Sequence, residues 1–154
     1  MKKAMALCLA MVCLLLCACG GKNGSAQEPV EMNLHEVYGK LPDVLPEMVF
    51  LEPIIRGVDA ENCEQALIYA AANGLVADEV WLIEAKSADQ LNEIQTLAEN
   101  HLRMQKETYK SYAPEQFAVL EDAELIVVGN YLALFVNPQA EQLKDAFLTA
   151  AESK

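Results

Sequence analysis

Two pairs of turn-forming residues constrain what this chain can fold into. Asn73-Gly74 lies inside the stretch 65–86, and Gly129-Asn130 lies inside the stretch 124–136. Asn-Gly is the strongest short-range signal for a β-hairpin, and glycine at the first position of a two-residue loop suits a type II′ turn. The sequence therefore predicts two hairpins, one in each stretch.

The first hairpin has an alternative interpretation. Residues 65–72 (QALIYAAA) are rich in alanine, which favours a helix, so a continuous helix over 60–72 remains open. Residues 79–85 (EVWLIEA) are instead rich in β-forming side chains and predict a strand. The Asn73-Gly74 pair between them favours the hairpin.

Helices are predicted around and between the hairpins. Residues 87–90 (SADQ) form a capping box, and apolar side chains then recur at helical spacing. The longest helix is therefore expected over 88–112, stopped by Pro114. Shorter helices are expected over 33–41, 114–120 and 139–152, and a short helical turn after the capping residue Asp59.

The order of these elements predicts an α+β fold. A ββαββα arrangement preceded by an N-terminal helical segment gives a four-stranded, mainly antiparallel sheet from two hairpins, with the helices packed on one face. Residues 80–83 and 132–136 are apolar on both strand faces, however, and such strands are normally covered on both sides. We expect the apolar pieces 44–45, 48–51 and 54–55 to supply the second cover; otherwise a partner or an apolar ligand does so.

The start of the chain has the features of an export signal. Lys2 and Lys3 precede an apolar run over 4–17, and the small residue Ala18 directly precedes Cys19. These features define a secretory signal, whereas a membrane-spanning helix needs about 20 apolar residues. The pattern resembles the lipobox of bacterial lipoprotein signal peptides, in which a diacylglycerol is attached to the cysteine and the chain is cut just before it.

This resemblance implies that Cys19 is the lipid attachment site, because Cys17 follows the bulky Leu16 whereas Cys19 follows the small Ala18. An ordinary secreted protein, cut near Ala18 or Ala26, is the alternative. The lipobox places the protein on the extracytoplasmic face of the cell membrane, held by its lipid. The expected parts of the chain are a signal peptide, 1–18, a lipidated cysteine with a flexible tether, 19–32, and a single globular domain, 33–154.

The net charge of the mature chain limits the classes of molecule that it can bind. Removing Lys2 and Lys3 leaves 9 basic against 23 acidic side chains, a net charge of −14. Nucleic acid is excluded as a partner, because its phosphates require a basic surface. Cys19 and Cys63 would be the two remaining cysteines, so no internal disulfide is expected. Cys63 is expected in a helical turn as a partly buried apolar side chain, with no nearby cation to activate its thiol.

The sequence contains no strong catalytic or metal-binding signature. A G-x-S-x-G elbow, an H-E-x-x-H helix and a P-loop are all missing from it. His35 and His101 lie far apart without a cysteine or carboxylate cluster around them, so we interpret the first as a surface residue and the second as a boundary residue. We expect no catalytic residue, no metal and no cofactor; the ligand-binding residues, if any, are unknown at this stage.

Two further features are interpreted as structural. Glu121, Asp122 and Glu124 form an acidic corner whose spacing matches no calcium loop, so a solvated turn is expected. Trp81 is the only tryptophan and lies in the middle of a predicted strand, where core packing is expected in preference to a role as a binding anchor.

Five short segments together resemble a known family. They are 45–48 (LPEM), 57–59 (GVD), 77–80 (ADEV), 112–116 (YAPEQ) and 129–131 (GNY). Similar segments occur in the uncharacterised bacterial lipoprotein family known as domain of unknown function 4358, and the resemblance covers about 45–150. It implies a membrane-anchored extracytoplasmic domain of unknown role and supports the first hairpin. The segments are structural and transfer no catalytic residue.

These observations predict a membrane-anchored, non-catalytic binding module with an envelope protein as its partner. The alternative is a small-ligand or peptide-sensing subunit of a membrane complex, which would need a concave apolar pocket at Trp81 or on the second sheet face. A hydrolase would need a clustered nucleophile and base that the sequence does not display.

Overall fold

The computed structural model describes residues 30–43 and 47–153. The expected signal peptide, Cys19, most of the expected tether and the apolar pair 44–45 lie outside the described residues. Within the described part of the chain, none of the helices combines the length and the apolar character that crossing a membrane requires.

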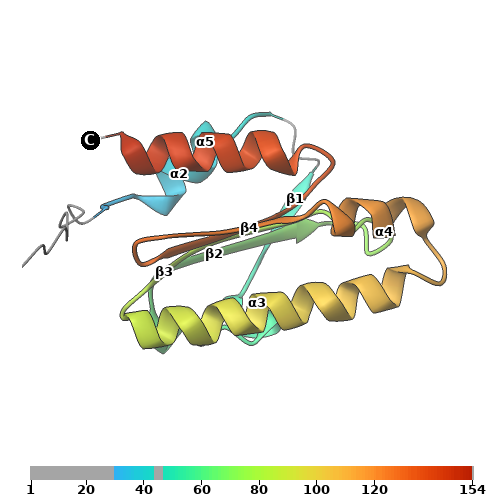
Figure 1. The fold of residues 1–154 in the computed structure, drawn as a ribbon, viewed down its shortest axis with the longest axis horizontal. Coiled ribbons are helices and arrows are strands. Elements are labelled where there is room, and N and C mark those ends of the chain that lie inside the picture. The colour runs from blue at the N-terminus through green and yellow to red at the C-terminus, as the bar shows by residue number, and fades with distance from the viewer. Residues whose placement is uncertain (1–29, 44–46, 154) are drawn as a thin grey trace, which may run out of the picture.

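A five-stranded antiparallel sheet forms the middle layer of the domain (Figure 1). The antiparallel α+β prediction is confirmed, but the predicted number of four strands is wrong. The additional strand is β1, expected as an apolar plug, which pairs with β2 from Met48 opposite Ala71 to Leu51 opposite Ile68. The strand order is β1 (Met48–Leu51), β2 (Cys63–Ala71), β3 (Glu79–Ala85), β5 (Tyr131–Val136) and β4 (Glu124–Val128).

Both predicted hairpins are present, and β2 excludes the alternative helix over 60–72. The β4–β5 loop is tight, as expected: Val128 pairs with Tyr131, and Gly129 has a φ of +58°. No described residue other than glycine has a positive φ, so the φ of Asn130 is negative. The turn therefore fits type II′, because a type I′ turn needs a positive φ at both central residues. The β2–β3 connection is wider than the Asn73-Gly74 signal suggests and spans 72–78.

The β4–β5 turn gives a paired stability prediction. Gly129→Ala is expected to lower the free energy of unfolding by about 1–2 kcal/mol, because an L side chain is strained at positive φ. Gly39→Ala is the matched control, since a Cβ there meets nothing within 4 Å and alanine favours the helix by about 0.5–1 kcal/mol. Urea unfolding of both variants checks the opposite signs; a destabilising Gly39→Ala or a neutral Gly129→Ala would contradict them.

Within the residues that the structure describes, four α-helices and two short 3₁₀ helices accompany the sheet. Asn33 caps α2 (Leu34–Lys40) by accepting hydrogen bonds from the backbone N–H groups of His35 and Glu36. The last α-helix begins slightly later than predicted, because the Asn137 side chain closes a turn by accepting from Gln139 N. The helices are α2 (Leu34–Lys40), η1 (Pro53–Arg56), η2 (Ala60–Asn62), α3 (Ala88–Tyr109), α4 (Pro114–Glu121) and α5 (Ala140–Glu152).

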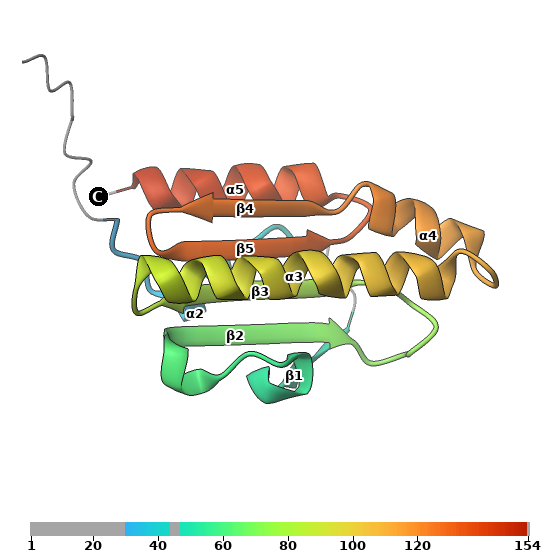
Figure 2. The same ribbon diagram turned by 60° about the horizontal axis from the view of Figure 1, so that its bottom comes forward.

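The helices cover both faces of the sheet, so the prediction of helices on one face is wrong. Figures 1 and 2 show α3 on one face and α2 with α5 on the other, with α4 continuing from the end of α3. The reason is the apolar character of both strand faces: Trp81 and Ile83 of β3 belong to the core beneath α3, whereas Val80 and Leu82 belong to the core beneath α2 and α5.

The second face is therefore covered by α2 and α5, and the described pieces of the expected cover lie elsewhere: residues 48–51 form strand β1 of the sheet itself. Ile54 and Ile55 lie exposed on η1. The packed domain also includes the end of the expected tether, because Met32 is buried and its backbone N–H donates to the Tyr131 hydroxyl over 2.9 Å.

Candidate functional site

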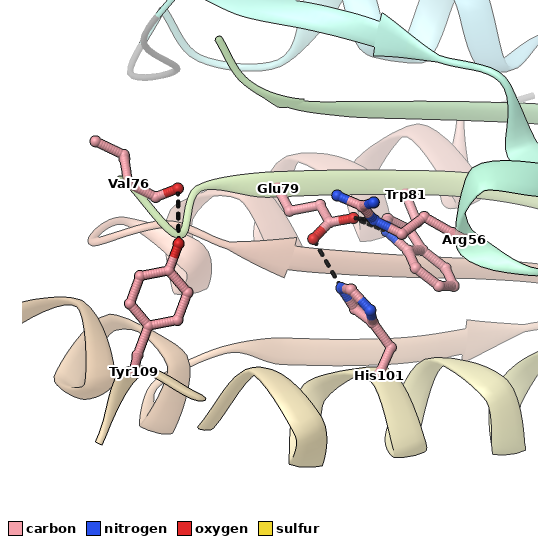
Figure 3. Close-up of polar contacts among 6 residues, drawn as sticks. All are labelled: Arg56, Val76, Glu79, Trp81, His101 and Tyr109. Atoms are coloured by element: carbon pink, nitrogen blue, oxygen red, sulfur yellow. Dashed lines mark hydrogen bonds and ion pairs between the residues drawn. The ribbon is translucent and has the colours of Figure 1, made fainter. Parts of the chain in front are cut away.

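The carboxylate of Glu79 is the most deeply buried charged group among the described residues. Glu79 begins β3 and is 3% exposed. It accepts hydrogen bonds from Arg56 Nε (2.5 Å), Trp81 Nε1 (2.8 Å) and His101 Nε2 (2.8 Å), as Figure 3 shows. We call these four residues the Glu79 cluster. It joins η1 and α3 to the first strand residue of β3.

The cluster keeps Glu79 ionised. Burial raises the pKa of Glu79, but the hydrogen bonds and charge of His101 and the hydrogen bonds from Trp81 and Arg56 outweigh burial and hold this pKa below its ordinary value. Every donor is directed at the carboxylate, and the cluster contains no nucleophile. Such an arrangement stabilises the packing of η1 and α3 against the start of β3.

Sequence reasoning missed the Glu79 cluster. It placed His101 at a boundary, which fits a side chain 15% exposed, but did not pair it with Glu79. A signal was present: Arg56 is the only basic residue between Lys40 and Lys86, and Glu79 opens a strand that is otherwise almost wholly apolar. Because a buried carboxylate almost always has a charged partner, the single cation of this segment is the expected partner of Glu79.

A second buried polar pair lies where β5 ends. Asn137 Nδ2 donates to Asp78 Oδ2 over 2.7 Å, and both residues are buried. Burial raises the pKa of Asp78, against the lowering effect of the hydrogen bond from Asn137. The pair joins the β2–β3 loop to the turn before α5. The nearby Tyr109 hydroxyl lies within 3.4 Å of the Val76 carbonyl oxygen and also holds this loop (Figure 3).

The predicted acidic corner lines a hollow of about 490 Å³ at the junction of α4, β4 and α5. Lys144 Nζ approaches Glu124 Oε1 to 2.6 Å and neutralises part of its charge. Within the described ranges, no three His, Cys, Asp or Glu side chains come together in a way that would hold a metal ion. A second hollow, of about 370 Å³, lies between α2 and α5.

A group of exposed apolar side chains is the most distinctive surface feature. Val49 and Phe50 of β1 are 45% and 47% exposed, and Ile54 and Ile55 of η1 are 70% and 58% exposed. We call these four residues the β1–η1 patch. They are half of the eight exposed large hydrophobic residues in the described part of the chain. Exposed large apolar side chains that gather in one segment, here within residues 49–55, mark candidate interaction sites on protein surfaces.

The patch rests on an aromatic support. The Phe50 ring meets the Tyr69 ring edge-on at 5.7 Å between centroids, and Tyr69 stacks on Tyr38 at 4.1 Å. These two ring contacts link β1, β2 and α2 at this edge of the sheet. The exposed part of Phe50 is therefore held in a defined position, as a binding anchor requires.

The other residues singled out in the sequence lie in the core, on α2 and at the start of β2. Trp81 is fully buried, which confirms core packing. His35 is exposed on α2, as predicted. Cys63 is buried, as predicted, but it is the first residue of β2, so the predicted helical turn is wrong there. Burial raises the pKa of the Cys63 thiol, which lowers the fraction present as the reactive thiolate. Cys19, the predicted lipid site, lies outside the described residues and stays a prediction.

The fold and these sites define a three-layer α+β domain in which an antiparallel sheet carries an apolar patch at one edge. Over residues 55–137, more than half of the chain, the sequence matches the family model described as Domain of unknown function (DUF4358), and the chain belongs to that family. This confirms the family resemblance, and four of the five short segments lie within the matched residues, whereas 45–48 precedes them. Comparison with the curated proteins and with the solved structures gave no match.

Proposed function

We propose that this protein is a non-catalytic binding module of the cell envelope, held on the extracytoplasmic face by a lipid on Cys19. The β1–η1 patch is the observation that carries the proposal, because four large apolar side chains within the segment 49–55 are 45–70% exposed. A folded domain retains such a cluster at a thermodynamic cost that a protein partner removes by covering it.

Three other observations support a binding module. The second sheet face is covered by α2 and α5, so the domain is closed without a ligand there. Trp81 is fully buried in the core beneath α3, so its side chain is not available as an exposed contact for a small ligand. The buried carboxylates of Glu79 and Asp78 are each bound by side-chain donors from other elements, which fits a structural role for both.

The anchor is tested by metabolic labelling of the lipid attachment site. Cys19→Ala is expected to abolish lipid attachment and leave the protein unprocessed, because the cysteine sulfur carries the diacylglycerol in lipobox proteins. Cys17→Ala is the matched control, since Cys17 lies in the segment that is removed. Metabolic labelling with a fatty acid, followed by mass spectrometry of the N-terminal peptide, reads the outcome. Unchanged labelling of Cys19→Ala would contradict the anchor.

The binding surface is tested by crosslinking the full-length protein in its own membrane. Replacing both Ile54 and Ile55 with aspartate is expected to reduce the yield of a specific complex by tenfold or more, since burying one isoleucine contributes about 1.5–3 kcal/mol. Val127→Asp is the matched control, because Val127 is an exposed apolar residue on the opposite edge strand, β4. Equal loss in both variants, or loss in neither, would contradict the assignment of the patch.

A further inference from the structure

The free edge of β1 determines how a partner can bind at the β1–η1 patch. Among residues 30–43 and 47–153, β1 is hydrogen-bonded to β2 on one side only and is the outermost strand of the sheet. An outermost strand presents unpaired backbone N–H and C=O groups, which form a template for another strand. Proteins commonly protect such edges with lysine, proline or a bulge inside the strand; β1 (MVFL) contains neither lysine nor proline, and its register with β2 is regular.

Both faces at this edge are apolar. Val49 lies on the same side of the sheet as Leu51, which packs against the core beneath α3. Phe50 lies on the opposite side, against Tyr69. A strand added beside β1 would therefore find an apolar neighbour on each face, and cross-strand pairs of this kind stabilise a sheet.

The opposite edge strand, β4, is less accessible. Four of its five residues are only partly exposed, and α5 lies along it (Figure 2). The described chain also begins next to the β4–β5 turn, because a Cβ on Gly129 would lie 3.8 Å from the Val30 side chain. The tether therefore joins the domain beside the turn that β4 enters, whereas β1 is at the far edge of the sheet.

The charges beside β1 select the partner. Glu47 and Glu52 flank the strand at its two ends, and both are exposed. The basic residue of this segment, Arg56, is directed inward to Glu79 and is not available to compensate them. A partner strand lying along 47–52 gains by placing a lysine or arginine opposite each glutamate.

The same charges disfavour two other occupants. If two copies paired β1 with β1 over the four strand residues, Glu47 of each would lie opposite Glu52 of the other, and both domains are strongly acidic. The tether residues 20–29 (GGKNGSAQEP) contain a single alanine as their apolar residue and cannot cover an apolar patch.

We propose that β1 binds an extended segment of a partner protein by strand addition, and that this segment has an apolar centre with a basic residue at each end. This mode rests on the proposed function, since it places the partner on the same patch. Backbone hydrogen bonds along Met48–Leu51 provide the pairing, and Glu47 and Glu52 provide selectivity for the basic ends.

The test uses three fluorescent peptides and the full-length protein purified in detergent. The first is Lys-Val-Tyr-Val-Thr-Lys, the second has glutamate at both ends, and the third has proline in place of tyrosine. We expect the lysine peptide to bind about tenfold more tightly than the glutamate peptide, because two exposed ion pairs replace two repulsions. We expect the proline peptide not to bind, because proline lacks the N–H group that pairs with a strand.

The matched protein variant exchanges the selecting charges. With Glu47 and Glu52 both replaced by lysine, the preference between the first two peptides is expected to reverse. Hydrogen exchange should show protection of β1 amides by the lysine peptide and none at β4. Equal affinity for both charged peptides, binding of the proline peptide, protection at β4 or an unchanged preference in the exchanged variant would each overturn strand addition.

The outcome also separates this mode from the proposed function. If the peptide tests fail while crosslinking in the membrane still depends on Ile54 and Ile55, the patch binds its partner by side-chain contacts and strand addition is wrong. If crosslinking does not depend on the patch, the proposed function itself is wrong, whatever the peptides do.

Discussion

Replacing Phe147 with alanine is expected to lower the free energy of unfolding by about 3–5 kcal/mol. Phe147 of α5 is fully buried, and its ring meets the Phe135 ring edge-on at 6.2 Å between centroids. It belongs to the core between the sheet and α5, on the face that sequence reasoning left without a helix. The loss would be a large part of the roughly 5–15 kcal/mol that stabilises a typical domain.

Phe50→Ala is the matched control for this prediction. Phe50 is 47% exposed on the edge strand, so its truncation removes much less buried area and leaves no enclosed cavity. We expect a loss of about 1 kcal/mol or less. Urea unfolding followed by circular dichroism measures both values. A small effect of Phe147→Ala, equal to that of Phe50→Ala, would contradict the three-layer arrangement.

Glu79→Gln is expected to lower the free energy of unfolding by about 3–5 kcal/mol at pH 7, because it leaves the Arg56 guanidinium without its anionic partner in a largely buried position. The amide of glutamine also presents an N–H₂ group to donors that need an acceptor. Glu93→Gln, at an exposed position of α3, is the control and should change stability by less than about 0.5 kcal/mol.

The pH dependence of this effect has a definite sign. The pKa of Glu79 is lower in the folded than in the unfolded chain, so below the ordinary glutamate pKa of about 4.3 the unfolded chain binds more protons. The stability contributed by Glu79 is complete above that pH and is lost as the pH falls through its lowered folded pKa. The stability difference between the wild type and Glu79→Gln should therefore shrink in acid.

Asp78 changes the pH dependence of stability in the opposite direction. Burial raises the pKa of Asp78 in the folded chain, so its protonation in acid favours the folded state. Asp78 is present in both proteins, so its contribution cancels in the difference. A difference between the wild type and Glu79→Gln that stays constant or grows from pH 6 to pH 3 would contradict the ion-paired Glu79 cluster.

Local features of the sequence predicted the local features of the fold. The Gly129-Asn130 turn, the caps at Asn33 and Ser87 and the strand over 79–85 all depend on residues within a few positions of each other. The stretch 65–72 was ambiguous by helix propensity, and pairing with β3 decided it as a strand. Tertiary contacts commonly override propensity in such alanine-rich segments.

Features that depend on distant contacts were not predicted. β1 is a four-residue strand between Pro46 and Pro53, too short for a period to be recognised, and it is defined by pairing with β2. Apolar residues on both strand faces indicated a second cover but did not identify α2 and α5 as the helices that supply it.

The candidate site also contains one feature that local sequence predicts and others that depend on distant contacts. The position of Trp81 in the core followed from its place in an apolar strand, whereas the Glu79 cluster brings together η1, β3 and α3, whose residues are 22 and 23 positions apart. No spacing rule for a single element connects such residues. The β1–η1 patch was not predicted either, because its apolar residues were expected to cover the sheet, whereas the fold leaves them 45–70% exposed.

Site-specific photocrosslinking tests the central claim most directly. A photoreactive phenylalanine analogue is placed at position 50 or, separately, at position 127 of the full-length protein, and cells are irradiated before the membrane fraction is analysed by mass spectrometry. We predict a discrete adduct with one envelope protein from position 50, competed by the lysine-ended peptide, and no such adduct from position 127. No adduct from either position, or the same adduct from both, would contradict binding through the edge of β1.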